Sequence, residues 1–301
     1  MDAFWRRAAL MAGAFASLAI SGPSHGADVT ISFSRLSAPG FELGRGQVEL
    51  ATGARDRGGS ATPGQLRVFV RKVALGPAFV GLDRLDLRCS LALGTSPAGS
   101  GGETSCVDGQ VKVLMPNEAF EQSGRFSVST SARRLRARLK GLGVGEGSVS
   151  GTFALDDAGV SKATLSAQGI ALKNLLRPGA IGLESVSGKL DVELVRNAGD
   201  GNRDEGNLTV RARGVDMSDP QGTFVTEGVA GEVDLKFVRG PKGEYDFNAN
   251  SHFRGGVVLI DPLVVDFEED ELRGQATGVW SKALRITRAR LSHGPNINAT
   301  L

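Results

Sequence analysis

The stretch Val229-Ala230-Gly231-Glu232-Val233-Asp234-Leu235-Lys236-Phe237 decides the fold. Apolar and charged residues alternate along it with a period of two, which is the pattern of a β-strand with one buried and one wet face. Two earlier segments share its Val-x-Gly-x-φ-x-φ form, in which φ is an apolar residue, and they begin at Val149 and Val186. The three starts are 37 and 43 residues apart. Recurrence of one strand pattern at this spacing predicts a repeating sheet.

The same alternation extends over most of the chain, as at residues 66–71, 134–140, 189–194 and 245–253, with turn signals between the segments. The 42 Gly in 301 residues amount to about twice the average usage. Helical turns are expected only at residues 117–122 and 172–176, which could not cover such a sheet. The sequence therefore predicts an all-β fold: an extended, curled antiparallel meander (β-groove) with few or no helices or, as the alternative, a compact β-sandwich.

The first residues have the order of an export signal. Arg6-Arg7 precede an apolar stretch at residues 8–20, and small, helix-breaking residues follow at 21–27. An uncleaved anchor remains the alternative, although residues 8–20 would rise only about 20 Å as a helix, against a hydrocarbon core of roughly 30 Å. We expect a signal peptide at residues 1–26 and a β domain at 27–301, with a subdivision near residue 125 left open. The expected location is the periplasm, with membrane association left open.

The two cysteines, Cys89 and Cys106, have sixteen residues between them. In an oxidising compartment they are expected to form one disulfide across a hairpin, which would constrain the unfolded chain by about 3 kcal/mol. Two free thiols are the alternative. Cys89 shares the apolar strand face with Leu87, whereas Cys106 alternates with the apolar Val107 and Val111. The pattern therefore places the two cysteines on opposite faces of the sheet, where they could not pair. A bulge or a loop position at Cys106 would resolve this.

Several features of the second half recur together in one family. They are the repeated Val-x-Gly opening of a strand, the strand exit Leu165-Ser166-Ala167-Gln168-Gly169-Ile170-Ala171-Leu172, and Gly278-Val279-Trp280 followed by Leu284-Arg285-Ile286. In these features the chain resembles, from about residue 126 to the C-terminus, the AsmA-like and TamB-like repeating β-groove proteins of bacterial envelopes. The nearest branch is that of YdbH, named for a dicarboxylate transport domain.

This resemblance implies a function in cell-envelope maintenance without catalysis. A periplasmic sheet would shield phospholipid acyl chains in its concave apolar face during lipid transport between the two membranes. The implied partners are a phospholipid or another acyl lipid, and envelope membrane proteins or lipoproteins. No cofactor is expected.

An apolar groove makes physical sense without specific polar contacts, because each buried lipid methylene contributes about 0.8 kcal/mol. The alternative is that the same side chains fill a closed protein core. The candidate lining consists of residues on apolar strand faces: Phe126, Val128, Leu135, Leu139, Phe153, Leu190, Leu194, Val233, Leu235, Phe237, Phe247 and Phe253.

The most concentrated charge is a basic row. It would contact lipid phosphates or an anionic membrane surface, at about 1 kcal/mol per residue. A solvated strand face that discourages edge pairing is the alternative. Nucleic acid is not expected, because aromatic residues are not interleaved with the row and the formal net charge is only +2. The row consists of Arg133, Arg134, Arg136, Arg138 and Lys140.

Catalytic and metal-binding patterns are missing from the sequence. His252 and His293, the two histidines after the expected leader, belong to neither a metal-ligand spacing nor a nucleophile motif. The acidic run at residues 268–271 is typical of a solvated turn, and residues 200–206 depart from a calcium loop because the glycine comes one position late. We expect no enzyme and no metal site. An exported β-sandwich module for carbohydrate or protein ligands remains the alternative, weakened by the content of two Trp and one Tyr.

Overall fold

The computed structural model describes residues 28–38, 41–51, 64–74, 79–94, 103–116, 118–131, 134–156, 159–176, 179, 182–198, 204–240, 243–281, 283–295 and 297–300. The expected signal peptide lies outside these residues. The chain divides into two compact units. Unit 1 comprises Met1–Gly145 and Val149–Ser161, and unit 2 comprises Glu146–Ser148 and Lys162–Leu301. Residue 125, where a subdivision was left open, lies inside unit 1.

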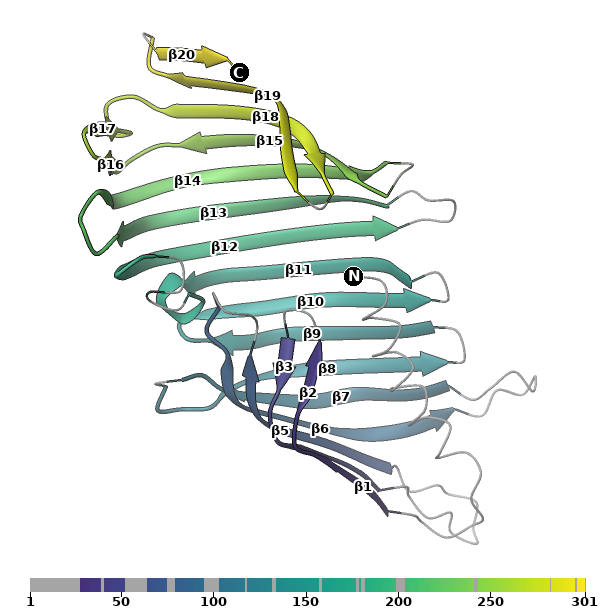
Figure 1. Ribbon diagram of the computed structural model, residues 1–301. Helices are drawn as coiled ribbons and strands as arrows, with labels where there is room; N and C mark the ends of the chain where they lie inside the picture. The colour runs from purple at the N-terminus through teal and green to yellow at the C-terminus, as the bar shows by residue number, and fades with distance from the viewer. Residues whose placement is uncertain are drawn as a thin grey trace, which may run out of the picture. The chain divides into compact units, whose positions relative to one another are not determined.

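Unit 1 is built from short early strands followed by longer ones. They are β1 (Asp28–Phe33), β2 (Leu36–Ala38), β3 (Phe41–Leu43), β4 (Gly46–Ala51), β5 (Gly64–Ala74), β6 (Leu82–Gly94), β7 (Glu103–Leu114), β8 (Gln122–Ser131), β9 (Arg134–Val144) and β10 (Gly147–Asp156). From β4 to β10 each strand pairs with the next one in the chain, and the pairs with printed registers are antiparallel. Strand β1 pairs with β4, β3 with β5, and β2 with β3. Figure 1 shows this succession of neighbouring strands.

Unit 2 has one short 3₁₀ helix among its described elements. They are β11 (Gly159–Ala171), η1 (Leu172–Asn174), β12 (Ser185–Ala198), β13 (Asp204–Ser218), β14 (Phe224–Arg239), β15 (Tyr245–Phe253), β16 (Val257–Ile260), β17 (Leu263–Asp266), β18 (Leu272–Trp280), β19 (Leu284–His293) and β20 (Ile297–Thr300). The antiparallel order is β11-β12-β13-β14-β15-β18-β19-β20. Strand β14 also pairs with β16 along its first residues, and β16 pairs with β17.

The predicted all-β antiparallel meander is confirmed within each unit. The three Val-x-Gly segments lie in β10, β12 and β14, which are every second strand of the meander. The helical turn expected at residues 172–176 is present as η1, whereas the one expected at 117–122 is wrong where the structure describes it. Residues 119 and 120 form bends, and β8 begins at Gln122. A helical turn does not form there because the alternating pattern of β8 starts directly after the loop, and these residues pair as a strand instead.

Cys89 and Cys106 form the expected disulfide between β6 and β7, with Cα atoms 5.9 Å apart. The expected bulge is also present. The register shifts between Arg88 and Leu91 on β6, and between Cys106 and Gly109 on β7. The extra residues turn Cys106 onto the face that carries Cys89, which resolves the conflict in the sequence pattern.

Two bulges in unit 2 are held by aspartates. Gly169 has a φ of +64° and donates its N–H to Asp191 Oδ1 at 2.6 Å, and Gly228 has a φ of +63° and donates its N–H to Asp216 Oδ1 at 2.7 Å. Glycine adopts this left-handed conformation at low cost. Each carboxylate satisfies an N–H that the bulge removes from the strand ladder.

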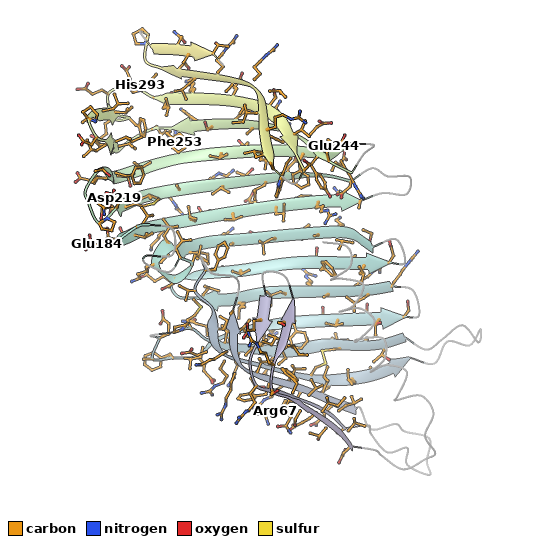
Figure 2. The ribbon with its side chains drawn as sticks, in the orientation of Figure 1. Arg67, Glu184, Asp219, Glu244, Phe253 and His293 are labelled. Atoms are coloured by element: carbon orange, nitrogen blue, oxygen red, sulfur yellow. A yellow bond between two sulfur atoms is a disulfide. The ribbon has the colours of Figure 1, made fainter. Side chains whose placement is uncertain are left out.

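A small core closes one end of the strands of unit 2. Figure 2 places Phe253 and His293 at this end, together with Asp219, and Glu244 at the opposite end. The buried cluster consists of Leu172, Val215, Val229 and Phe267. Leu172 is the first residue of η1 and Phe267 directly follows β17, and both pack against Val215 of β13 and Val229 of β14. The rest of the sheet extends beyond this cluster.

Candidate functional site

Strand register in unit 2 gathers apolar side chains on one side of the sheet, called here the apolar face of unit 2. Directly paired residues of antiparallel strands point to the same side. One row of paired residues is apolar across seven strands, a width of about 29 Å at the usual strand spacing. From β11 to β19 this central row is Leu165, Leu194, Leu208, Leu235, Ala249, Ala276 and Ala289.

The seven predicted groove residues of unit 2 all belong to this face. Leu194 and Leu235 lie in the central row, and Val233 lies in the row beside it, paired with Val210 and Ser251. The remaining ones lie in rows to either side: Phe237 and Phe247 form one directly paired couple, and Leu190 and Phe253 lie in the row nearest the small core.

Unit 1 presents an apolar face of the same kind. Phe126 pairs with Leu139, Leu135 with Thr130, and Val128 with Cys106 of the disulfide. The sheet register thus brings four predicted residues of unit 1 to one side. The fifth, Phe153, lies in β10.

All twelve predicted lining residues are half-buried. None of them is among the fifteen fully buried apolar residues found in the described part of the chain. At the strand ends remote from the small core, Trp280, Leu284 and Ile286 are 53%, 63% and 51% exposed. These faces are therefore partly open to solvent within the units.

Among the described residues, phenylalanine rings cover glycines of the neighbouring strand at five places on these faces. A Cβ atom added to the glycine would overlap the ring in each pair, so the ring lies flat over the backbone of the adjacent strand. A strand glycine marks a place where another group approaches closely. The faces therefore carry flattened rings rather than projecting ones. The directly paired couples are Phe33 with Gly46, Phe126 with Gly109, Phe237 with Gly206, Phe253 with Gly231, and Phe247 with Gly278.

A polar network at the rim of the apolar face of unit 2 was not predicted. The buried Asp204 carboxylate accepts two hydrogen bonds from Arg196, at 2.8 and 2.7 Å, and one from the Tyr245 hydroxyl at 2.7 Å. Burial raises the pKa of Asp204, but the bonds from Arg196 and Tyr245 outweigh this and hold the pKa below its ordinary value. Arg196 stands at a position where the alternation of Leu190 and Leu194 predicts an apolar residue. This charged residue on the apolar side was the signal from which the network could have been predicted.

On the opposite, polar face of unit 2, strands β12, β13 and β14 carry charges that neutralise one another. Arg211 contacts Glu232 on one side and Glu193 on the other, at 3.7 Å for the second pair. Arg213 contacts Asp191 at 2.6 Å. Each pair joins neighbouring strands, so the charges support the same register that builds the apolar face.

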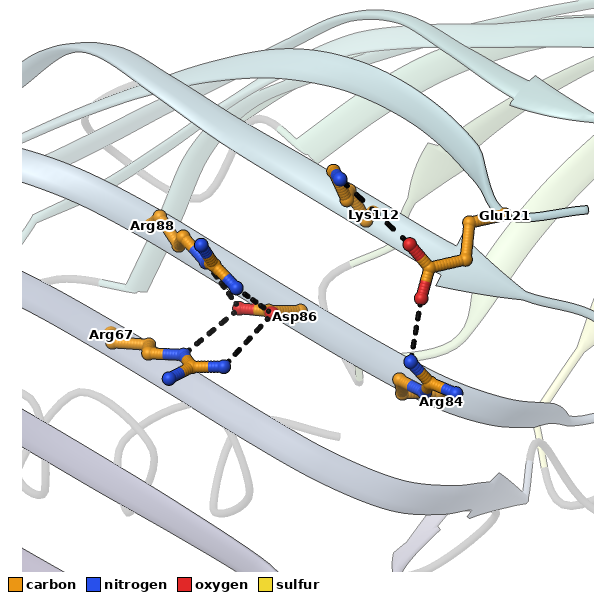
Figure 3. Close-up of polar contacts among 6 residues, drawn as sticks. All are labelled: Arg67, Arg84, Asp86, Arg88, Lys112 and Glu121. Carbon is orange, nitrogen blue, oxygen red and sulfur yellow. Dashed lines mark hydrogen bonds and ion pairs between the residues drawn. The ribbon is translucent and has the colours of Figure 1, made fainter.

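The polar face of unit 1 has a related network on β5 and β6, shown in Figure 3. Asp86 is buried and accepts hydrogen bonds from Arg88, at 3.3 and 2.9 Å, and from Arg67, at 3.5 and 3.3 Å. Burial raises the pKa of Asp86, while the two guanidinium groups lower it by more, and the net pKa lies below its ordinary value. Beside it, Glu121 contacts Arg84 at 2.7 Å and Lys112 at 3.8 Å.

The predicted basic row lies on this polar face. Arg134, Arg136, Arg138 and Lys140 are exposed on β9, and Arg133 lies outside the described residues. A cleft of about 710 Å³ is lined by residues of β7, β8 and β9, among them Lys112, Arg125, Arg138 and Lys140.

Within the described residues, no group of three or more His, Cys, Asp or Glu side chains is placed to hold a metal ion. The part of the chain that the structure describes contains no helix long and apolar enough to cross a membrane. Comparison with family models, curated proteins and solved structures finds no match to the chain. The resemblance to AsmA-like and TamB-like proteins therefore stays a prediction.

Proposed function

We propose that the protein binds the acyl chains of a lipid on the apolar faces of its sheet and shields them from water, as an exported protein of the cell envelope. The observation that carries this proposal is the apolar row that crosses seven strands of unit 2, in which Leu165 is exposed and the other six residues are half-buried. Apolar faces of this extent are typical of binding surfaces.

The composition of the face suits an acyl chain. Its central row holds aliphatic side chains, and the flattened Phe237 and Phe247 rings beside it leave few projections. A chain of about 16 methylenes would gain about 13 kcal/mol on full burial, and about half of that on an open face. Association costs roughly 4 to 15 kcal/mol. Binding of one chain would thus be weak and reversible, which fits transfer better than storage.

Trp280 provides a direct test, because it lies at the end of the apolar face and Trp5, the other tryptophan, lies in the expected signal peptide. Brominated acyl chains quench indole fluorescence on contact. We expect a lysophospholipid with a brominated chain to quench Trp280 and its unbrominated counterpart to leave the emission intensity unchanged. Equal emission with both lipids would contradict the proposal.

A matched pair of variants separates the two faces. Leu235→Asp places a carboxylate in the central row, and Asn248→Asp adds the same charge on the opposite face, where position 248 pairs with Lys236. Mass spectrometry of lipid retained by chain purified from membranes should show a loss of about tenfold for Leu235→Asp and no loss for Asn248→Asp. Absence of lipid from the unaltered chain, with the face closed to solvent labelling, would overturn the proposal.

A further inference from the structure

Strands β8 and β9 place five cations on one side of unit 1. This basic face consists of Arg125 on β8 and four residues of β9, all exposed: Arg134, Arg136, Arg138 and Lys140. The register sets a serine against each arginine of β9, in the pairs Ser131 with Arg134, Ser129 with Arg136 and Ser127 with Arg138. The face is therefore a ladder of hydroxyl and guanidinium groups.

The pair of facing residues at the Lys140 end of β9 consists of two like charges. Arg125 lies directly opposite Lys140. Like charges in directly paired positions destabilise a sheet. Among the residues that the structure describes, no carboxylate forms an ion pair with any of the five cations, although Asp86 and Glu121 each contact two cations elsewhere on the same unit. A local arrangement that opposes folding is expected where a ligand compensates for it.

The surroundings of the basic face add a cleft and an apolar contact. The cleft of about 710 Å³ lies against Arg125, Arg138 and Lys140, with Lys112 from β7 at its edge. Asp108 is the one carboxylate among its lining residues. Val107, at the bulge of β7, also lines the cleft and is 67% exposed. A basic surface beside an exposed apolar side chain suits the interface of a bilayer.

We infer that the basic face docks on the anionic phosphates of a membrane leaflet. Arginines of β9 follow one another at about 6.7 Å, and the row from Arg134 to Lys140 extends over about 20 Å. A row of this length matches two or three neighbouring headgroups rather than one small anion. Nucleic acid fits less well, because none of the described residues on the polar face of β8 and β9 is aromatic. The inference is independent of acyl-chain binding.

Vesicle sedimentation with the full chain tests the inference. The probes are vesicles of phosphatidylcholine alone and vesicles with about 30% phosphatidylglycerol. The unaltered chain should bind the anionic vesicles at least tenfold more tightly, and the preference should vanish in high salt. Arg136→Gln with Arg138→Gln should lower the affinity about 25-fold, at about fivefold per cation. Arg136→Lys with Arg138→Lys should retain most of it.

The control removes the same charge from another strand. Arg285 and Arg288 are exposed on β19 and pair with Val279 and Thr277 of the polar face of unit 2. Arg285→Gln with Arg288→Gln should change the affinity by less than threefold. Equal losses from both double variants would overturn the inference, because they would report net charge alone. Equal binding to both vesicle types, or binding of inorganic polyphosphate without binding of vesicles, would also overturn it.

Discussion

Strands β12 to β14 of unit 2 and the basic face of unit 1 use charge in opposite ways. On unit 2, Arg211 lies between Glu193 and Glu232, and Arg213 contacts Asp191. On unit 1, the basic face sets cations against serines and against one another. Both are exposed faces of antiparallel strands with apolar residues behind them. Arg211 and Arg213 therefore support the register of the sheet in unit 2, whereas the cations of the basic face do not support folding.

The largest expected effect comes from removing a charge that supports register. Asp191 accepts the Gly169 N–H at 2.6 Å and contacts Arg213 at 2.6 Å, so Asp191→Ala leaves a bulge amide and a guanidinium without their acceptor. Loss of about 2 kcal/mol from the free energy of unfolding is expected, since hydrogen bonds to charged groups contribute about 1.5 to 3 kcal/mol. Arg138→Ala should change it by less than about 0.5 kcal/mol. Urea denaturation measures the free energy of unfolding of both variants. Equal losses would show that the charges of the two faces contribute equally to stability.

A smaller effect of opposite sign is expected at the end of the basic face. Lys140→Glu converts the like-charge pair with Arg125 into an opposite-charge pair. The free energy of unfolding should rise by about 0.5 kcal/mol, because such pairs contribute roughly 0.2 to 1 kcal/mol. Binding to anionic vesicles should fall in the same variant. A variant that is less stable than the unaltered chain would show that Lys140 supports the fold, and the comparison would fail.

Much of the apolar side of the fold could be predicted from the sequence. The alternation of Val233, Leu235 and Phe237 determines which side chains share a face, whatever their partners are. The conflict between Cys89 and Cys106 predicted a bulge or a loop position at Cys106, and the structure contains the bulge. Period-two patterns are local, so they can be read without knowledge of the pairing.

Cross-strand partners could not be predicted, because bulges shift the register between distant segments. Gly206 and Phe237 are paired across β13 and β14. The sequence around either residue does not indicate which residue it pairs with. The Val-x-Gly repeat shows the same limit. Gly188 has a φ of +103° at a bulge, whereas Gly231 lies beneath the Phe253 ring, so one motif serves two structural roles.

The smallest expected effect is a difference in acid sensitivity. Loss of stability at low pH should change in a variant of Glu271 on unit 2 and not in a variant of the basic face. A hydrogen bond from Arg273 and a contact with His252 at 2.9 Å lower the pKa of Glu271 on unit 2. A carboxylate with a lowered pKa stabilises the folded state above its unfolded pKa, about 4.3 for Glu, and this contribution is lost as the pH falls through the folded value. Between pH 6 and pH 3 the urea midpoint should therefore fall less for Glu271→Gln than for the unaltered chain.

The basic face supplies the control for this measurement. Its five residues have no carboxyl group that titrates in the acid range, so Arg138→Gln should lose as much stability between pH 6 and pH 3 as the unaltered chain does. A pH profile of Arg138→Gln that matched that of Glu271→Gln would mean that acid acts through the net charge of the whole chain. A distinct profile for Glu271→Gln would assign part of the acid response to the contacts of Glu271 with Arg273 and His252.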